Sequence, residues 1–377
     1  MSGFLITGGA GFIGANFVHH CLRQYPRSKV VVLDALTYAG KLANLEAVQG
    51  HPALKFVHGN IADQNLVEDI LRTEKVATLV HFAAESHVDR SIQGPDAFVH
   101  TNVLGTHSLL KAARQVWLEE SRMKQHRFHH VSTDEVFGSL GPDDPPFHER
   151  TPYSPNSPYS ASKAGSDHLV RAYHHTYGLQ VTVSNCSNNY GPYQLPEKLI
   201  PLAIVNILHG RPLPIYGDGR NIRDWLHVSD HCRAIDLVVH QGVSGETYNV
   251  GGDSESENLA LVELLCEIAD RLFDQAPGLR QKYPHCPAAV GTPSASLITF
   301  VPDRLGHDRR YAIDGSKIRR ALGFHARITL AEGLRQTVEW YAQNDGWWRE
   351  VMDRSYHEWI RGHYGNGARP TPCSSDG

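Results

Sequence analysis

A tyrosine and a lysine stand four residues apart in the segment YSASK, at Tyr159 and Lys163. On a helix, positions four residues apart share one face, and a nearby ammonium group favours the phenolate form of tyrosine. We therefore expect Lys163 to lower the pKa of Tyr159. A phenolate at that position is a base that can take a hydroxyl proton while hydride leaves the same carbon.

Two adjacent carboxylates, Asp134 and Glu135, directly follow Ser132 and Thr133. The hydroxyl of Ser132 or Thr133 can hold the substrate oxygen that Tyr159 deprotonates. A simple oxidation needs no further acid or base, whereas an elimination needs a base for a carbon-bound proton and an acid for the leaving hydroxyl. The competing interpretation is a solvated acidic loop. The position after an expected strand favours a catalytic pair, with Asp134 and Glu135 serving an elimination.

Three glycines recur at intervals of three, at Gly8, Gly11 and Gly14, between an apolar run and a helical segment. Such glycines allow a tight turn, a close approach to a pyrophosphate and close packing of helix on sheet. Asp34 ends the next strand, 20 residues after Gly14, and its carboxylate suits ribose hydroxyls. No arginine closely follows Asp34, so we expect NAD rather than NADP. The alternative is a glycine-rich turn with a surface aspartate.

Short apolar runs alternate with helical stretches through the first half of the chain. We expect strands at 4–6, 30–33, 55–58, 77–82 and 128–132, and helices at 15–24, 98–117 and 159–177. Continuous apolar strands that alternate with helices predict a parallel sheet covered on both faces. The predicted fold class is α/β, a Rossmann-type doubly wound parallel sheet. Ligands bind at the carboxyl ends of such strands, where Asn60, Ile61, Ala83 and Ala84 fall.

Proline and glycine become frequent after about residue 141, and the pattern changes. We expect a Rossmann domain over 1–185, to which later helices return, and a smaller C-terminal substrate-binding lobe mainly over 186–340. Segments 189–196 and 211–221 resemble loops, and 275–296 resembles an irregular insertion. A helical segment is expected over 341–364, and a disordered tail over 365–377.

Composition excludes several classes of protein. The 377 residues carry a formal net charge of −4, so no basic surface favours nucleic acid as a partner. No apolar run approaches the roughly 20 residues of a membrane span. The six cysteines form no CxxC pair, which is typical of free thiols in the cytoplasm. No HExxH motif occurs among the 24 histidines, so we expect no metal.

Longer stretches make the interpretation more specific. The chain resembles the dTDP-glucose 4,6-dehydratase family of the extended short-chain dehydrogenase/reductase superfamily. The resemblance runs to about residue 340 and rests on TGGAGFIG (7–14), AAESHVDRSI (83–92), STDEVFG (132–138), YSASK (159–163), NNYGPYQLPEKLIP (188–201), IYGDG, NIRDWLHV and DH within 215–231, YNVGG (248–252), and DR and GHDRRYAID within 303–314. Three features depart from the family pattern: Asn60 stands where an aspartate is usual, Leu305 stands where a proline is usual, and segment 275–296 is long.

The resemblance implies a role for each site residue. Tyr159, with Lys163 as its partner, is the base in the oxidation of the sugar at C4, and Thr133 binds the 4-oxygen. Asp134 is the acid of the elimination, and Glu135 is its base. Implied NAD contacts are Gly8, Gly11, Phe12, Ile13, Gly14, Asp34, Asn60, Ile61, Ala83, Ala84, Thr101, Tyr159, Lys163 and Asn189. Implied nucleotide-sugar contacts are Ser86, Thr133, Asn188, Lys198, Leu199, Pro214, Tyr216, Arg223, Asn258, Arg304 and His307, with Arg223 meeting the diphosphate.

Further expectations follow from the same resemblance, and some alternatives stay open. Helices 98–117 and 160–177 resemble those that pair in family homodimers, although they also suit a core. The base pocket would prefer thymidine, with the long 275–296 segment able to reshape it. The alternatives are the same reaction on UDP-glucose, an epimerase or decarboxylase of nucleotide sugars, a GDP-mannose dehydratase, which would show a hydroxyl residue at position 134, and an NAD-sensing module without catalysis.

Overall fold

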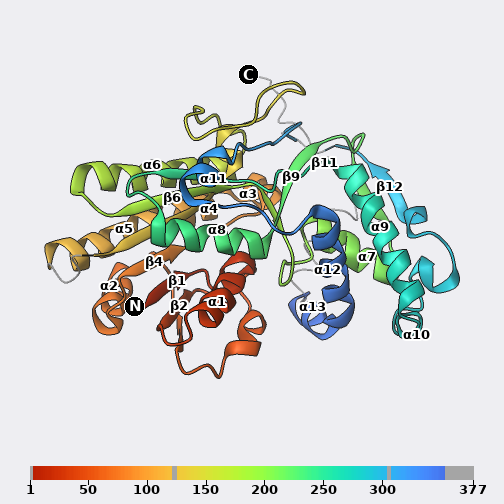
Figure 1. The fold of residues 1–377 in the computed structure, drawn as a ribbon, viewed down its shortest axis with the longest axis horizontal. Helices are drawn as coiled ribbons and strands as arrows, with labels where there is room; N and C mark the ends of the chain where they lie inside the picture. Colours follow the sequence, from red (N-terminus) through yellow and green to blue (C-terminus); the bar gives the residue numbers. More distant parts are fainter. Residues whose placement is uncertain (1–2, 121–124, 304–306, 353–377) are drawn as a thin grey trace, which may run out of the picture.

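The computed structural model describes residues 3–120, 125–303 and 307–352. Its main feature is a sheet of seven strands whose neighbours all pair in parallel, in the order β10-β6-β5-β4-β1-β2-β3 (Figure 1). The strand order reverses between β1 and β4, which is where doubly wound sheets bind ligands. The strands are β1 (Phe4–Thr7), β2 (Val30–Asp34), β3 (Leu54–His58), β4 (Thr78–His81), β5 (Arg127–Thr133), β6 (Val181–Cys186) and β10 (Thr247–Val250).

Helices cover both faces of this sheet, as the apolar strands predict. Along β1, Phe4 and Ile6 belong to one core with α1 and α8, whereas Leu5 belongs to another core with α2, α5 and α6. Successive side chains of a strand point to opposite faces, so each face has its own helical layer. These helices are α1 (Phe12–Gln24), α8 (Val228–Gln241), α2 (Gln64–Glu74), α5 (Thr106–Ala113) and α6 (Pro158–Tyr177). The predicted fold class is confirmed.

The helix expected over 98–117 is present as a run of several helical types. The segments are α4 (Pro95–Phe98), the π-helical turns η2 (Val99–Gly105) and η3 (Arg114–Glu119), and α5 between them. Three shorter elements lie on the ligand edge of the sheet: η1 (Leu42–Val48), α3 (Val88–Gln93) and η4 (Asp134–Phe137). The helical prediction is therefore correct, although it did not anticipate the π-helical turns.

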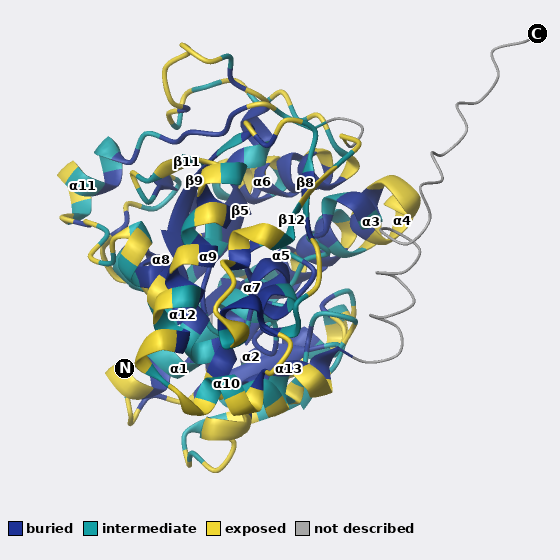
Figure 2. Ribbon diagram, turned by 90° about the vertical axis from the view of Figure 1, so that its right-hand side faces the viewer, coloured by how far each residue is buried: buried dark blue, intermediate teal, exposed yellow. Residues whose placement is uncertain are grey.

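A second group of elements forms a smaller lobe beside the sheet (Figure 1). Its core lies among α7, α9, α12 and α13, and α7 is buried along most of its length (Figure 2). Its strands are β7 (Asn188–Tyr190), β9 (Ile222–His227) and β11 (Glu255–Glu257) in one sheet, and β8 (Leu213–Tyr216) with β12 (Ile298–Val301) in another. Its helices include α7 (Leu199–His209), α9 (Asn258–Gln275), α10 (Gly278–Lys282), α12 (Leu330–Gln343) and α13 (Asp345–Val351).

The second half of the chain differs from expectation in several places. Segments 189–196 and 211–221 are not all loop, since the first contains the end of β7 and the second contains β8. Segment 275–296 contains α10 and the 3-10 turns η5 (Pro287–Val290) and the start of η6 (Ser294–Leu297), and it buries Tyr283 and Cys286 in the small-lobe core. Strand β10 joins the large sheet although it falls within 186–340, while α11 (Ser316–Leu322) packs beside it.

Part of the C-terminal prediction lies outside the described residues. Within 341–364, α12 ends at Gln343 and α13 runs to Val351, and residues 353–364 are not described. The predicted tail over 365–377 also lies outside the described residues. Across the ranges that the structure does describe, every helix is too short or too polar to cross a membrane.

Candidate active site

One cavity of about 450 Å³ runs along the carboxyl edge of the large sheet and continues into the small lobe. Gly8, Asp34, Ala83 and Thr133 bring the ends of β1, β2, β4 and β5 to its wall. Every site residue expected from the sequence lines this cavity, except Arg304, which lies outside the described residues. The fold thus brings together side chains that are more than 250 residues apart in the sequence.

The glycine loop leaves no room for side chains. Gly8 has φ +67°, and a Cβ there would lie 2.6 Å from the amide nitrogen of Ala83. A Cβ on Gly14 would lie 2.2 Å from the carbonyl oxygen of Gly8. The loop leads into the N-terminus of α1, whose free N–H groups favour an anion. The site therefore fits the pyrophosphate of a dinucleotide.

Asp34 is buried at the end of β2, where its carboxylate accepts hydrogen bonds from the amides of Ala10 (2.9 Å) and Leu36 (2.8 Å). Burial raises the pKa of Asp34, and these two hydrogen bonds oppose the rise. Asn60 lies in the same wall, and its side-chain oxygen accepts a hydrogen bond from the amide of Ala62 at 2.9 Å. The loop, Asp34 and Asn60 thus mark one end of the cavity.

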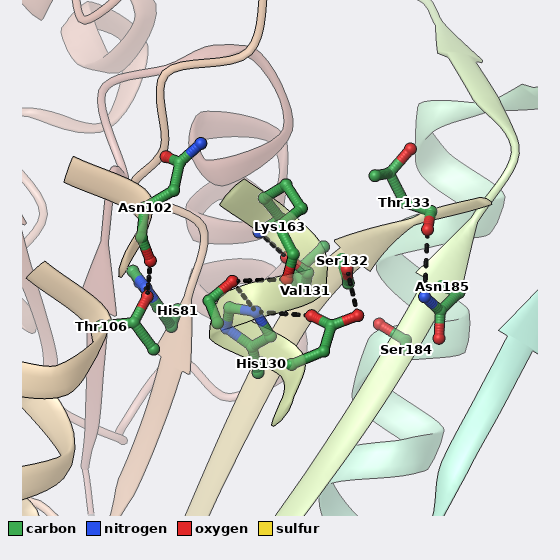
Figure 3. Close-up of polar contacts among 12 residues, drawn as sticks. His81, Asn102, Thr106, His130, Val131, Ser132, Thr133, Lys163, Ser184 and Asn185 are labelled. Atoms are coloured by element: carbon green, nitrogen blue, oxygen red, sulfur yellow. Dashed lines mark hydrogen bonds and ion pairs between the residues drawn. The ribbon is translucent and has the colours of Figure 1, made fainter. Parts of the chain in front are cut away.

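Helix α6 begins where it can present Tyr159 and Lys163 to the cavity. Ser157 caps the helix in a capping box with Ser160, and Pro158 occupies the first turn. Lys163 is buried, and its Nζ donates to the carbonyl oxygen of Val131 at 2.8 Å (Figure 3). The helix therefore holds both side chains one turn apart, beside β5.

The expected lowering of the Tyr159 pKa is wrong for this structure. The pKa of the phenol is raised well above its ordinary value, first because it is buried and next because of the charge of Glu135. The Lys163 ammonium is itself disfavoured by burial, which lowers its pKa, and Asp167 opposes that effect. Helical spacing places the two residues together but says nothing about desolvation, which dominates here.

The two adjacent carboxylates sit in different environments. Strand β5 ends at Thr133, and the 3-10 turn η4 then turns Asp134 inward, leaving it 2% exposed, whereas Glu135 is only partly buried. Burial, followed by the charges of Glu135 and Asp224, raises the pKa of Asp134 well above its ordinary value. Thr133 donates to Oδ1 of Asp134 at 3.3 Å, while Oδ2 is buried with no hydrogen-bond partner among the described residues. The protonated form of Asp134 is therefore favoured.

A buried polar network holds the end of the cavity that contains Asp134 and Tyr159. Ser132 donates to Oδ2 of Asp167 at 2.8 Å, and Nε2 of His130 lies 3.1 Å from Oδ1 (Figure 3). Tyr153 also donates to Oδ2 of Asp167, at 2.9 Å. Burial lowers the pKa of His130 to about 4, in spite of this carboxylate. Asn185 donates to the carbonyl oxygen of Thr133 at 3.0 Å. The ends of β5 and β6 are thus tied to α6.

The small lobe supplies the other end of the cavity. Asn188 and Asn258 each have a buried side-chain oxygen without a hydrogen-bond partner among the described residues. Lys198 donates to the carbonyl oxygen of Ser86 at 3.1 Å and so bridges the lobe to the large sheet. Leu199, Pro214 and Tyr216 form an apolar and aromatic part of the cavity wall.

Arg223 and His307 complete this wall. Arg223 is buried, donates to the carbonyl oxygens of Ile222 (2.7 Å) and Asp308 (2.9 Å), and lies over the ring of Tyr311. His307 lies 2.6 Å from the carboxylate of Asp303. No residue of 275–296 lines the cavity, so this segment can affect the base pocket only indirectly. The segment leads instead into β12, which pairs with β8 and so supports Pro214 and Tyr216.

Comparisons with known proteins agree with this geometry. A family model described as GDP-mannose 4,6 dehydratase matches residues 5–337. A dTDP-glucose 4,6-dehydratase of Xanthomonas campestris pv. campestris is 53% identical over 358 residues, covering 94% of this chain and 97% of the relative.

Solved structures point the same way. A dTDP-glucose 4,6-dehydratase of Bacillus anthracis, solved in complex with NAD, is 44% identical with a TM-score of 0.80, and the match covers 93% of this chain and 100% of that one. Another from Streptomyces venezuelae, also solved with NAD, is 48% identical with a TM-score of 0.81, covering 92% and 99%.

The chain belongs to the dTDP-glucose 4,6-dehydratase family. Membership confirms the resemblance and narrows the alternatives. The family model carries the name of GDP-mannose dehydratases, but the sequence has Asp134 where we expect a hydroxyl residue in that group. An epimerase or decarboxylase does not need the Asp134–Glu135 pair, and both carboxylates line the cavity of this family member.

Several cavity residues were not anticipated from the sequence. Lys41 precedes η1 and Asn44 lies on it, Tyr193 comes from the NNYGPY stretch, and Trp347 and Val351 come from α13. The NNYGPY stretch was noted, so its tyrosine could have been included. No local motif marks Trp347 or Val351, because only the packing of α13 against the glycine-loop side brings them to the cavity.

Proposed function

We propose that the NAD-dependent dehydration of dTDP-glucose by this chain is carried out by residues at the end of β5 and the first turns of α6. The reaction oxidises C4, removes water across C5 and C6, and reduces C6, which gives dTDP-4-keto-6-deoxyglucose without net oxidation. When bound, NAD accepts the C4 hydride, returns it to C6 and, in its oxidised form, carries a positively charged ring. All proton transfers are left to the protein.

In the oxidation step, Tyr159 takes the proton of the C4 hydroxyl, and Thr133 holds the 4-oxygen by a hydrogen bond. Burial raises the pKa of Tyr159, so the phenolate needs a positive charge nearby. Lys163 supplies one from the next turn of α6, and Asp167 opposes the loss of its proton. Ser132, held by Asp167, keeps the end of β5 in position.

In the elimination step, Glu135 takes the C5 proton, which the new 4-ketone acidifies, and Asp134 gives a proton to the leaving C6 hydroxyl. The observation that carries this proposal is the buried, protonation-favouring environment of Asp134 next to the more exposed Glu135. A general acid must hold its proton at working pH, and burial provides this. The adjacent base must accept a proton, and Glu135 is the less buried of the two carboxylates.

We assign the two ends of the cavity to the two ligands. The glycine loop with Phe12 and Ile13, Asp34, Asn60 and Ile61 would hold the adenosine and pyrophosphate of NAD, and Ala83, Ala84, Thr101 and Asn189 would line its path toward Tyr159. The nucleotide sugar would take Ser86, Asn188, Lys198, Leu199, Pro214, Tyr216, Arg223, Asn258 and His307. On this division, 1–185 is mainly the NAD domain and 186–340 is mainly the sugar-nucleotide lobe.

We further propose a cytoplasmic homodimer that pairs through η2, α5 and α6. Val99, Leu104 and Tyr177 are large apolar residues on these elements, and they are exposed by 49%, 52% and 42%. Exposed apolar residues of this size on neighbouring helices suit a subunit interface. Light scattering of the purified protein, with Leu104→Glu as the disrupting variant, tests the pairing: a monomeric wild type would contradict it.

The decisive experiment supplies purified protein with dTDP-glucose and no added cofactor. We expect an alkali-stable 4-keto chromophore to form over many turnovers, because NAD is regenerated in each cycle. NADH that accumulates in proportion to product would contradict this cycle. Absence of product with dTDP-glucose would overturn the assignment of the reaction.

Competition between dTDP-glucose and UDP-glucose tests the base preference. We expect a higher kcat/KM for the thymidine compound. One methyl group in an apolar pocket discriminates by only about 1–3 kcal/mol, so slower turnover of the uridine compound is compatible with the proposal. Equal values, or a preference for uridine, would refute thymidine selectivity and leave the dehydratase chemistry unaffected.

A further inference from the structure

Helix α13, near the C-terminal end of the described residues, reaches the cofactor end of the cavity. Trp347 and Val351 of this helix both line the cavity wall. The indole nitrogen of Trp347 donates to the side-chain oxygen of Asn44 at 2.8 Å. This hydrogen bond joins the small lobe to η1 of the large domain, across 303 positions of sequence.

Asn44 connects Trp347 to the glycine loop itself. Asn44 is 2% exposed, and its side-chain nitrogen donates to the carbonyl oxygen of Ala10 at 2.8 Å. The same carbonyl accepts from the amide of Lys41 at 3.0 Å, and the amide of Ala10 donates to Asp34. The indole, the loop and the ribose-binding carboxylate therefore belong to one hydrogen-bonded chain.

An aromatic cluster holds α13 in this position. Tyr193, which also lines the cavity, stacks on His19 of α1 with ring centres 5.4 Å apart. Trp340 and Trp347 meet Tyr193 edge-on, at 5.0 and 5.8 Å. The backbone of Tyr193 has φ +67°, a conformation that residues other than glycine rarely adopt and that persists only where the surroundings enforce it.

We propose that Trp347 retains NAD: with Asn44 it forms a latch between the small lobe and the glycine loop, and the cofactor leaves only when this latch opens. The inference rests on the cofactor placement proposed above. It gives α13 a role in a reaction where NAD is regenerated rather than consumed, since a cofactor that escapes between turnovers stops the cycle. Trp347 is a retaining residue and takes no part in proton transfer.

The rate at which NAD is released tests the latch directly. The protein is loaded with labelled NAD, diluted into excess unlabelled NAD, and the rate of label loss is followed. Trp347→Phe keeps the ring but removes the indole donor, and we expect release to accelerate about fivefold, as for the loss of one hydrogen bond. Trp347→Ala also removes the ring contact with Tyr193, and its release should be faster still.

The neighbouring tryptophan is a matched control. Trp348 donates its indole N–H to the carbonyl oxygen of Tyr341 at 2.9 Å, within the small lobe, and it does not line the cavity. Trp348→Phe loses a bond of the same kind, so we expect a lower Tm with wild-type NAD release.

Each remaining outcome counts against the latch. A Trp347→Phe variant that releases NAD at the wild-type rate would overturn the latch. Equal acceleration of release in Trp347→Phe and Trp348→Phe would also overturn it, because it would indicate general loosening of the lobe. A wild-type protein that binds no NAD at all would instead refute the proposed cofactor site.

Discussion

The two ends of the cavity differ in how their polar groups are satisfied. At the sheet end, Lys163, Ser132 and Asn185 all donate to partners within the protein (Figure 3). In the small lobe, the side-chain oxygens of Asn188 and Asn258 are buried without a hydrogen-bond partner among the described residues. Leaving a buried polar atom unpaired costs about 1–3 kcal/mol. We infer that the sheet end is organised in advance for chemistry, whereas the lobe end is completed by its ligand.

Not every polar atom at the sheet end has a partner: Oδ1 of Asn185 and Nδ1 of His130 are also buried without a hydrogen-bond partner among the described residues. Among the proposed proton-transfer groups, one atom is unpaired in the same way. Oδ2 of Asp134 is buried and has no hydrogen-bond partner in the described part of the chain. This is the position that an acid needs, because a proton already engaged by the protein would be harder to give away. The comparison therefore separates side chains that donate to partners within the protein, such as Lys163 and Ser132, from cavity-lining side chains that keep an unpaired atom for the substrate, such as Asp134.

The largest effect is expected for Asp134→Asn. The amide cannot protonate the C6 hydroxyl, so loss of water should slow by about 10²–10⁴-fold while C4 oxidation changes far less. A substrate with fluorine at C6 needs less protonation on departure, and the defect should shrink with it. Rapid-quench measurement of both substrates checks this, and an equal defect with both would indicate a structural role for Asp134.

Asp167→Asn tests the positioning network. Asp167 opposes the burial that lowers the pKa of Lys163, so the amide should lower that pKa further. The ammonium is then lost at lower pH, and the alkaline limb of the kcat profile should move toward acid by about one pH unit. Tyr153→Phe is the matched control, since it removes a donor to Asp167 but keeps the charge. A shift of the same size in the control would refute the electrostatic explanation.

Asn258→Ala tests the lobe end of the comparison. If its buried oxygen binds the nucleotide sugar, KM should rise about tenfold with little change in kcat, since the interaction is made in both ground and transition states. Asn206→Ala is the control, because Asn206 lies in the same lobe but outside the cavity. A fall in kcat at unchanged KM would place Asn258 in the organised, catalytic end instead.

The smallest effect concerns stability away from the cavity, where Asp236 of α8 accepts from Tyr25 and lies 3.1 Å from His20 and 3.0 Å from His240. Hydrogen bonding to Asp236 raises the pKa of His240 above 6.5. The stabilisation is therefore complete below about pH 6.5 and is lost as the pH rises through the folded-state pKa. His240→Gln should lower Tm at about pH 6 and have almost no effect at about pH 9. In an Asp236→Asn background that pH dependence should disappear.

Local sequence patterns located the sheet end well. Glycines, Asp34 and the YxxxK pair each follow a strand or begin a helix, so their neighbours in sequence fix where they lie. Strand β8 was missed because Pro212, Pro214 and Gly217 suggest a loop, and its partner β12 is more than 80 residues away. Trp347 was missed for the same reason: only tertiary packing brings it to Asn44.

The sequence was least informative about electrostatics. Helical spacing correctly places Tyr159 and Lys163 one turn apart, but the direction of the Tyr159 pKa shift depends on burial. For Asp134 and Glu135 the sequence gives two equivalent neighbours, and only the turn after β5 makes one buried and the other partly exposed. Desolvation depends on the folded surroundings of a side chain, so the spacing of residues in the sequence does not predict it.

Exchange of the C5 hydrogen in the two carboxylate variants tests the central claim most directly. Each variant is supplied with dTDP-glucose in deuterated water under single-turnover conditions, and deuterium at C5 is measured together with enzyme-bound NADH. The division of roles predicts that Asp134→Asn forms NADH and exchanges C5 but retains the C6 hydroxyl, whereas Glu135→Gln forms NADH without exchange. Normal C5 exchange in Glu135→Gln, or loss of exchange in Asp134→Asn alone, would contradict the assignment of acid and base.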